Sequence, residues 1–317
     1  MNPKISVVMS VFNGESYLAE AIESILDQTF TDFEFIIIND GSTDTSSDIL
    51  QDYAQQDPRI RLIMFDENIG LASALNHGIH QAQGEYIARM DCDDISQSSR
   101  LQQQVDYLDA HPEVCLLGAQ MMVVDKDKNP LFVFEVPPQH SLIIWNLFFG
   151  RTFAHPSVMM RRGVVLRVGG YDESISAAQD IDLWSRMIGQ GRFANLPEQL
   201  VYYRTHEHAT SIQKSDQQGT ILRLTHKRLL MQLWGDVVLD TTLTRFHKIR
   251  SGRLQFLKRD YEPIKVDLQR LAESLLAKGW ILPDEKYLID ADINRLLELI
   301  KPKHTGFWGR VLGKLKL

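Results

Sequence analysis

The sequence predicts an α/β fold in which a parallel β-sheet is covered by helices on both faces. Over the first 125 residues, short apolar runs alternate with segments whose apolar residues recur at helical spacing. The short runs are apolar at nearly every position, which is typical of strands buried on both faces of a parallel sheet. Beyond about residue 215, leucines recur at helical spacing, which predicts a helical region after the sheet.

Five apolar runs are predicted as strands, and the segments between them as helices that turn their apolar residues to one face. The strands are residues 5–9, 33–38, 61–65, 86–90 and 114–124. The helices are residues 17–28, 46–56, 71–81 and 101–109. In such sheets ligands bind beyond the carboxyl ends of the strands. We therefore expect the polar residues 10–13, 39–42 and 91–94 to lie along one edge of the sheet.

The pattern changes twice along the chain. From about residue 126 to 210 it is irregular and interrupted by prolines, with a short strand predicted at residues 200–203. Periodic leucines then predict helices, which are residues 221–234, 266–276 and 287–300. We divide the chain accordingly into residues 1–125, 126–214 and 215–317.

Composition is that of an ordinary globular protein. Of the 317 residues, 44% are hydrophobic and 24% are charged. No apolar run approaches the roughly 20 residues that span a bilayer, and the N-terminus has no signal-peptide pattern. Cys92 and Cys115 provide neither a disulfide framework nor metal-ligand spacing. We therefore expect a cytoplasmic protein.

Charge is distributed unevenly. Residues 1–214 carry 15 Lys+Arg and 29 Asp+Glu, whereas residues 215–317 carry 19 Lys+Arg and 12 Asp+Glu. The acidic part fits a metal-dependent site and gives little support to nucleic-acid binding. The basic part fits an acidic partner such as a membrane surface, and equally a solvated helical face.

The densest acidic segment directly follows the fourth predicted strand. Asp91, Asp93 and Asp94 place three carboxylates within four residues. Two such charges about 4 Å apart repel by ~1 kcal/mol in water and ~4 kcal/mol near a protein surface. A hard divalent cation would relieve this repulsion, because oxygen atoms are its preferred ligands. The alternative is a solvated acidic turn, and the segment alone does not decide between them.

Further polar residues stand at the ends of predicted elements. Asp40 ends the second strand, where it can accept hydrogen bonds from a bound base, although the turn that follows is also a good helix cap. Asp180 stands at a predicted helix start, either as a general base or as a carboxylate favoured by the helix dipole. Arg204 and His206 could meet a phosphate or a metal, although a single His is more often structural.

Six of these segments, in order and spacing, resemble family 2 glycosyltransferases. They are residues 7–13 (VVMSVFN), 24–34 (SILDQTFTDFE), 39–44 (NDGSTD), 68–71 (NIGL), 91–94 (DCDD) and 179–184 (QDIDLW). Each segment alone is weak, but six in order are highly specific and cover about residues 3–210. The resemblance implies a GT-A fold, with a Rossmann-like nucleotide-sugar-binding half, an acceptor-binding half and inversion at the transferred sugar. The helical residues 215–317 lie outside it.

The resemblance also implies roles for individual residues. The implied nucleotide-sugar contacts are Ser10, Phe12, Asn13, Asp40, Asp91 and Arg204, with Asp40 binding the imide of the base, typically uracil. The implied ligands of a Mn²⁺ or Mg²⁺ ion are Asp93, Asp91 and His206, and Asp180 is the implied general base. An inverting transfer needs one such base and neutralisation of the leaving diphosphate, with no second carboxylate.

We therefore expect a metal-dependent hexosyltransferase that moves a sugar from a nucleotide-diphosphate sugar, a UDP-sugar first, to a hydroxyl of a surface-glycan acceptor. Gln179 stands where the family usually has Glu, which keeps one alternative open: a non-catalytic sugar-nucleotide-binding subunit. A nicotinamide-dependent oxidoreductase is disfavoured, since no glycine-rich fingerprint follows the first strand.

The last residues, 305–317, mix aromatic, aliphatic and basic side chains. One interpretation is an interfacial segment that brings the enzyme to the inner face of the membrane and a lipid-linked acceptor. A docked or disordered tail is an equal alternative.

Overall fold

The computed structural model describes residues 2–206, 215–235, 238–252 and 256–301 and confirms the α/β fold. The first part comprises β1 (Ile5–Val11), α1 (Leu18–Leu26), β2 (Phe33–Asp40), α2 (Ser46–Gln56), β3 (Ile60–Phe65), α3 (Leu71–Gln81), β4 (Tyr86–Asp91), β5 (Ile95–Ser96), α4 (Arg100–Ala110) and β6 (Val114–Val124). The elements at residues 46–56, 71–81 and 114–124 have the predicted bounds. The other predicted elements of this part differ by at most two residues at either end.

Residues 126–210, which the sequence predicted to be irregular, contain regular helices and strands. They are β7 (Pro130–Phe134), α5 (His140–Phe149), the 3-10 turn η1 (His155–Ser157), β8 (Met159–Arg161), α6 (Arg162–Arg167), α7 (Gln179–Met187) and β9 (Arg192–Arg204). The strand predicted at residues 200–203 is only the end of β9, so that prediction was too short. Pro197 did not stop the strand because it lies where the β6–β9 register shifts and no ladder N–H is required.

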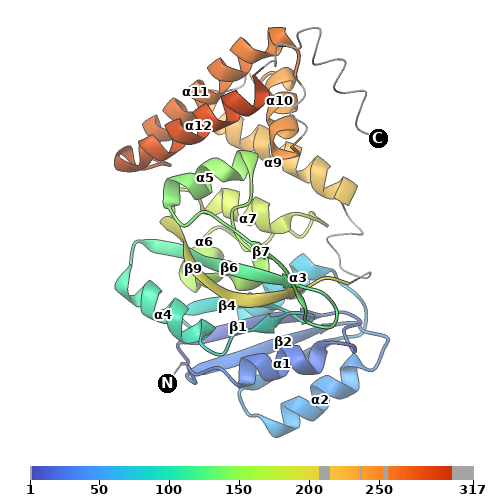
Figure 1. The fold of residues 1–317 in the computed structure, drawn as a ribbon. Helices are drawn as coiled ribbons and strands as arrows, with labels where there is room; N and C mark the ends of the chain where they lie inside the picture. Colours follow the sequence, from blue (N-terminus) through green and yellow to red (C-terminus); the bar gives the residue numbers. More distant parts are fainter. Residues whose placement is uncertain (1, 207–214, 236–237, 253–255, 302–317) are drawn as a thin grey trace.

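Four longer helices follow the sheet: α9 (Ser215–Trp234), α10 (Asp240–Arg250), α11 (Tyr261–Ala277) and α12 (Lys286–Ile300). Two 3-10 turns, η2 (Lys258–Asp260) and η3 (Pro283–Glu285), separate some of them. Of these helices α10 was not predicted, and the other three extend beyond their predicted bounds. Figure 1 shows that these helices stack at one end of the molecule, beyond α5 and α7.

The sheet is mixed, so the expectation of a parallel sheet was right for strands β1 to β4 and for the pair β6–β9 but not for the whole sheet. The strand order is β3-β2-β1-β4-β8-β6-β9-β5, with β7 paired to β6. Strands β1 to β4 are parallel, whereas β8 is antiparallel to both β4 and β6, and β5 is antiparallel to β9. The parallel half places the carboxyl ends of β1, β2 and β4 side by side, as predicted.

The side chains of the parallel strands alternate between two hydrophobic clusters. Tyr86, Ala88 and Met90 of β4 belong to the cluster that contains residues of α1 and α4. Ile87 of β4 belongs to the other cluster, which includes residues of α5 and α7 and extends through the C-terminal helices α9 to α12. Because side chains alternate along a strand, Arg89 and Asp91 lie on the same side as Ile87. The chemistry-bearing face of β4 is therefore the face covered by α7.

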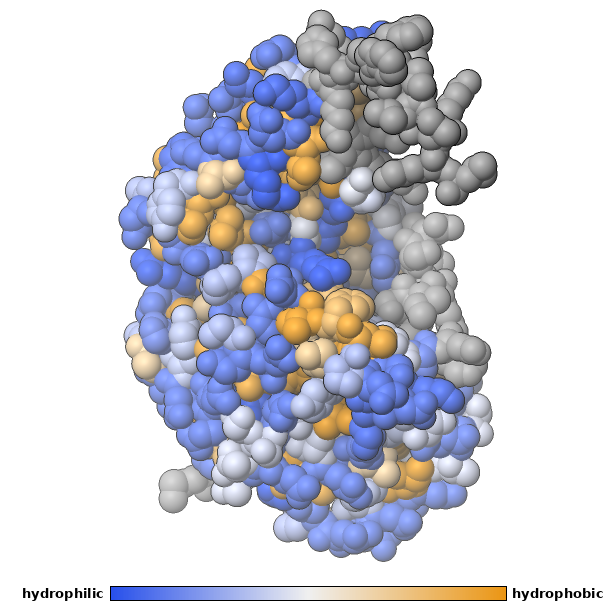
Figure 2. Space-filling model, in the orientation of Figure 1, coloured by the Kyte–Doolittle hydropathy of each residue, from blue (hydrophilic) through white to orange (hydrophobic). Residues whose placement is uncertain are grey.

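The surface is largely polar in the view of Figure 2, with apolar groups scattered between charged ones. The exposed hydrophobic side chains include Leu131 and Phe132 of β7. Among the described residues, no helix combines the length and apolarity needed to cross a membrane.

Candidate active site

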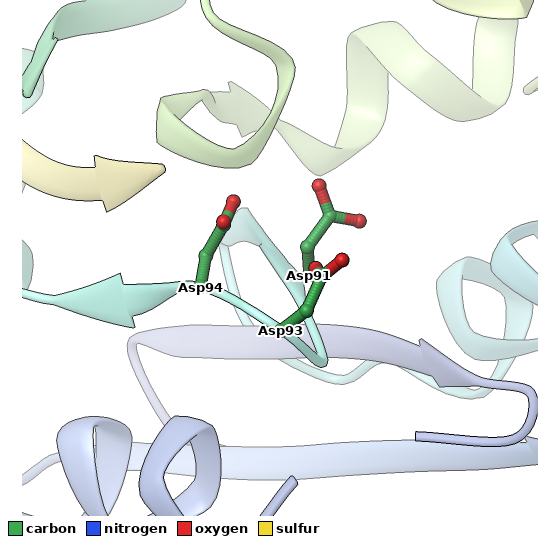
Figure 3. A group of neighbouring side chains, drawn as sticks. All are labelled: Asp91, Asp93 and Asp94. Carbon is green, nitrogen blue, oxygen red and sulfur yellow. The ribbon is translucent and has the colours of Figure 1, made fainter. Parts of the chain in front are cut away.

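The acidic cluster forms a turn between β4 and β5. One carboxylate oxygen from each of Asp91, Asp93 and Asp94 lies within 4.8 Å of the other two. Figure 3 shows that the three side chains extend from the turn on the same side. Burial and the charges of its neighbours raise the pKa of Asp94 well above its usual value. The pKa of Asp91 is raised too, by burial and by Asp93 and Asp180, although Arg89 opposes the shift.

Arg89 supplies a buried cation directly beneath this turn. Its Nη1 donates a hydrogen bond to Oδ2 of Asp91, and the residue is only 3% exposed. Its Nε has no hydrogen-bond partner among the described residues. Sequence reasoning gave Arg89 no role, although a charged residue inside an otherwise apolar strand was a usable signal.

Asp94 anchors the turn to the end of β9. It is fully buried, and its Oδ1 accepts a hydrogen bond from the backbone N–H of Arg204 at 2.9 Å. Its Oδ2 has no partner in the described part of the chain. Asp94 therefore holds the turn in place and leaves a buried acceptor atom beside the other two carboxylates.

Arg204 braces the same turn from the other side. Its guanidinium donates to the backbone oxygens of Asp93 and Lys126, both at 3.0 Å, and to the carboxylate of Glu20. It also lies over the ring of Tyr17, at 4.5 Å from the ring centre, and is only 3% exposed. Arg204 therefore braces the turn through three of its five N–H donors, and its expected contact with the donor substrate stays a prediction.

His206 lies beside Asp93, with Nε2 at 2.9 Å from Oδ2 of that residue, and Asp91 lies in the same group of carboxylates, so the structure brings the three expected ligands together. Three carboxylates, one of which has the unpartnered Oδ2 of Asp94, and a neighbouring imidazole are a donor set that suits Mn²⁺ or Mg²⁺. The residues present therefore fit the metal that the sequence implied.

Asp40 lies at the carboxyl end of β2, but its carboxylate faces a loop. Its oxygens accept hydrogen bonds from Nδ2 of Asn68 at 3.1 Å and from the backbone N–H groups of Ile69 at 2.7 Å and Gly70 at 3.1 Å. Only 2% of Asp40 is exposed. Here Asp40 fixes the loop, and its expected contact with the nucleotide base stays a prediction.

The end of β1 contributes more accessible groups. Phe12 is 48% exposed, and Ser10 pairs with Asp91 across β1 and β4. Asn13 joins the β1 and β2 loops, because its Oδ1 accepts from the N–H of Thr43 and its own N–H donates to Oγ of Ser42. The structure therefore places Phe12 as an exposed aromatic ring beside a loop held in one position.

Asp180 lies in the first turn of α7, as predicted, after Ala178, which has the left-handed φ of +54°. Burial raises the pKa of Asp180, while the N–H of Ile181 and the guanidinium of Arg89 oppose the shift. The charge of Asp180 in turn raises the pKa of Asp91, so the two carboxylates lie within electrostatic reach of each other. The neighbouring Gln179 is buried.

A neutral pair that the sequence did not suggest lies close by. Nε2 of His155 is 2.8 Å from the hydroxyl of Tyr171. Burial keeps the pKa of His155 well below its usual value, and the positive charge of Arg89 acts in the same direction. Asp180 and Asp91 both act on the pKa of Tyr171. Isolated His and Tyr residues carry no sequence signal of this kind, because only the fold brings them together.

Comparison with known proteins finds that this chain is similar to glycosyltransferases. The model of the family Glycosyl transferase family 2 matches residues 6–168. The O-antigen biosynthesis glycosyltransferase WbnJ of Escherichia coli is 36% identical over 212 residues, covering 65% of this chain and 81% of WbnJ. An uncharacterized glycosyltransferase of Haemophilus influenzae is 33% identical over 219 residues, covering 66% of this chain and 68% of the relative.

Two solved structures share the fold at low sequence identity. TarS 1–349 of S. aureus, in complex with UDP, has a TM-score of 0.58 and 17% identity, covering 94% of this chain and 90% of TarS 1–349. The mannosyltransferase PcManGT from Pyrobaculum calidifontis, in complex with GDP-Man and Mn²⁺, has a TM-score of 0.53 and 18% identity, covering 99% of this chain and 85% of that one. This chain therefore belongs to glycosyltransferase family 2 and is a glycosyltransferase of the GT-A fold.

Proposed function

We propose that this glycosyltransferase is metal-dependent and inverting, and that it moves a sugar from a nucleotide-diphosphate sugar, with UDP as the first nucleotide to test, to an acceptor hydroxyl. The observation that carries the proposal is the placement of Asp180 within electrostatic reach of the acidic turn. A base on one side and a cation-binding turn on the other are the two groups that an inverting transfer requires.

Asp91, Asp93 and His206 would hold the Mn²⁺ or Mg²⁺ ion, with Asp94 behind them as the anchor of the turn. The ion would supply positive charge to the diphosphate as it leaves. A donor set of carboxylates and one imidazole supports either metal. PcManGT, which shares the fold, was solved with Mn²⁺.

The nucleotide would lie over the loops that follow β1 and β2. Phe12 offers an exposed aromatic face for the base, and Ser10 and Asn13 offer polar atoms beside it. Asp40 would hold residues 68–70 in place beside the nucleotide, and Arg204 would brace the acidic turn. Direct contacts of these two side chains with the donor stay predictions. Since TarS was solved with UDP and PcManGT with GDP-Man, the choice of nucleotide remains a proposal.

The proposed reaction is a single displacement. The acceptor oxygen attacks C1 of the sugar from the side opposite the diphosphate, while its proton passes to the carboxylate of Asp180. The bond between C1 and the diphosphate oxygen breaks, and its electron pair leaves with the nucleoside diphosphate. Burial raises the pKa of Asp180, which makes it a better proton acceptor than an exposed carboxylate.

The acceptor is proposed to be a growing surface glycan, in agreement with the printed name of WbnJ, an O-antigen biosynthesis enzyme. The reaction would then take place at the cytoplasmic side of a membrane. The interfacial segment predicted at residues 305–317 lies outside the described residues.

The alternative of a non-catalytic subunit rested on Gln179. That side chain is buried at the start of α7, next to Asp180 in the sequence. The assay below distinguishes this alternative from the enzyme.

The test is a release assay with UDP-glucose, UDP-galactose, UDP-GlcNAc and GDP-mannose, each with Mn²⁺ or with EDTA, and with octyl glycosides or water as acceptor. We expect metal-dependent release of nucleoside diphosphate from one donor, lowered about 100-fold or more by Asp180→Asn with donor binding retained. Glu173→Gln, which changes a nearby exposed carboxylate, is the matched control. Binding without release for every donor would favour the non-catalytic alternative.

A further inference from the structure

Helix α1 begins directly beside the acidic turn. An added Cβ at Gly14, in the loop between β1 and α1, would lie 3.2 Å from Sγ of Cys92 in that turn. The N–H of Gly14 donates to Oγ of Ser46 at 2.9 Å, and its backbone oxygen accepts from the N–H of Tyr17 at 3.0 Å. The next residue, Leu18, is fully buried in the hydrophobic core. The backbone of Tyr17 is therefore held on both sides, at a fixed place next to the acidic turn.

The ring of Tyr17 packs on the guanidinium of Arg204. The guanidinium carbon lies 4.5 Å from the ring centre, and Arg204 is almost fully buried. An aromatic face attracts a cation at this distance, and does so more strongly where water is excluded. Hydrogen bonds to the backbone oxygens of Asp93 and Lys126 hold the guanidinium in place. Arg204 therefore gives the ring of Tyr17 a fixed surface to pack on.

Glu20 in the first turn of α1, three residues after Tyr17, binds the same guanidinium. Its Oε2 accepts a hydrogen bond from Nη2 of Arg204, and its Oε1 accepts one from Nζ of Lys128 at 2.6 Å. Burial raises the pKa of Glu20, but the hydrogen bonds from Lys128 and Arg204 outweigh burial and lower the pKa. Glu20 therefore stays charged and holds the first turn of α1 to the end of β9.

The ring of Tyr17 also contacts His206. The two ring centres are 5.2 Å apart, and the ring planes are inclined by 44°. Nε2 of the same imidazole lies 2.9 Å from Oδ2 of Asp93. The main chain before it is fixed, because the N–H and Oγ1 of Thr205 donate to the backbone oxygen of Val124 at 2.9 and 3.0 Å. The position of His206 is thus determined by Thr205, and the orientation of its imidazole by Tyr17 and Asp93.

We propose that Tyr17 is a positioning residue of the cation site, whose ring holds the His206 imidazole in the orientation in which Nε2 faces Asp93. This inference rests on the metal dependence proposed above. A ligand that is already oriented loses less conformational freedom when the ion binds, so the protein binds the ion more tightly. Tyr17 acts through His206, because its ring contacts the imidazole. Sequence reasoning placed Tyr17 only at the start of a predicted helix.

The test compares variants of the full-length chain by calorimetry, with Mn²⁺ titrated in the presence of UDP or of GDP. Tyr17→Leu and Tyr17→Gln both remove the ring, whereas Tyr17→Phe keeps the ring and removes only the hydroxyl. Tyr107→Leu is the matched control, because Tyr107 of α4 stacks on His111 with 4.1 Å between the ring centres and neither residue belongs to the proposed site. Thermal unfolding and nucleoside diphosphate release, from the donor that turns over in the panel above, are measured for each variant.

For Tyr17→Leu and Tyr17→Gln we expect the Mn²⁺ affinity to fall about tenfold, because changes to side chains that orient a metal ligand typically cost about 10- to 100-fold. The Mn²⁺ concentration for half-maximal release should rise by about the same factor, while the rate at saturating Mn²⁺ stays within about threefold of wild type. Tyr17→Phe keeps both ring contacts, so its Mn²⁺ affinity should stay within about twofold of wild type. Tyr107→Leu should lower thermal stability and leave the Mn²⁺ affinity unchanged.

Three results would overturn the inference while leaving the proposed function intact. One is a Mn²⁺ affinity of the ring-free variants within about twofold of wild type. The second is an equal loss of affinity in Tyr17→Phe or in Tyr107→Leu, which would assign the effect to the hydroxyl or to general stability. The third is a rate that stays about tenfold low at saturating Mn²⁺, which would mean that Tyr17 acts on the reaction by another route. If the wild type itself binds no Mn²⁺ with either nucleotide, the proposed metal dependence fails first and the inference fails with it.

Discussion

Replacing Asp40 with Asn tests whether this carboxylate holds a loop or reads a base. The three donors around it come from Asn68, Ile69 and Gly70, and two of them share Oδ2. The side chain of Asn has a single oxygen, which can accept either from the N–H of Ile69 or from the two donors that share Oδ2. One or two hydrogen bonds are therefore lost, and the NH₂ group of Asn then faces an N–H group. Hydrogen bonds to a charged group contribute about 1.5–3 kcal/mol each, so the loss in unfolding free energy should be about 1.5–6 kcal/mol.

Denaturant unfolding measures this loss, and calorimetry with the donor nucleotide measures the effect on binding. We expect both to fall, because the loop beside the nucleotide loses its anchor. Asp57→Asn is the control, since Asp57 accepts from the N–H and Nε of Arg59 at 2.9 and 3.0 Å in the turn before β3. That variant should lose stability and keep nucleotide affinity. If Asp40→Asn weakens binding while the unfolding free energy stays within about 0.5 kcal/mol of wild type, Asp40 reads the base and our reasoning is wrong.

Gly41→Ala should lower the free energy of unfolding, measured with denaturant, by at least about 1 kcal/mol more than Gly279→Ala does. Both glycines have left-handed φ angles, +68° and +70°. Only at Gly41 would an added Cβ meet the backbone, at 2.4 Å from the carbonyl carbon of Glu67. Equal losses would contradict that close approach. Burial and the charge of Arg250 lower the pKa of His226 to about 4. The stability that this neutral imidazole provides is therefore complete above about pH 6.5 and is lost as the pH falls toward 4. The loss in unfolding free energy is up to ~1.4 kcal/mol per pH unit. His226→Gln keeps a donor for the backbone oxygen of Leu147, so the unfolding free energy should depend less steeply on pH between 4 and 6.5 in this variant. The same slope as in the wild type would refute this account. Asp93→Asn should weaken Mn²⁺ binding, measured by calorimetry in the presence of nucleotide, at least about tenfold. Asp127→Asn, in the exposed β6–β7 loop, should leave that affinity unchanged. Equal Mn²⁺ affinities of the two variants would remove Asp93 from the proposed ligands.

The first 125 residues were predictable because their elements are determined locally. Periodic apolar residues and strand ends were enough to place the loops after β1, β2 and β4 along one edge, and the structure confirms that placement. The next part was harder to predict. Helix α5 is apolar on all sides, with Trp145 and Phe148 both fully buried, so it has no period to detect.

The site was predictable in its residue types and less so in its contacts. Asp93 with His206, and Asp180 at the start of α7, lie where the sequence suggested. The internal contacts of Asp40 and Arg204 depend on loops and strands that are distant in sequence, and no local pattern encodes them. The contact of Arg250 with the end of α5 has the same origin, since it forms only because α10 packs on α5.

The bracing of the acidic turn has a consequence for how the chain matures during synthesis. Asp94 and Asp93 are held by Arg204, which in turn reaches back to Glu20, 184 positions earlier. A ribosome adds about 5–20 residues per second, so roughly 5–25 s separate the emergence of the turn from that of its brace. During that interval Asp91 can pair with Arg89, whereas Asp93 and Asp94 lack the contacts that Arg204 and His206 provide in the folded chain. The turn reaches its final shape only when β9 has paired with β6 and β5, so the strand that closes the sheet also fixes the acidic turn.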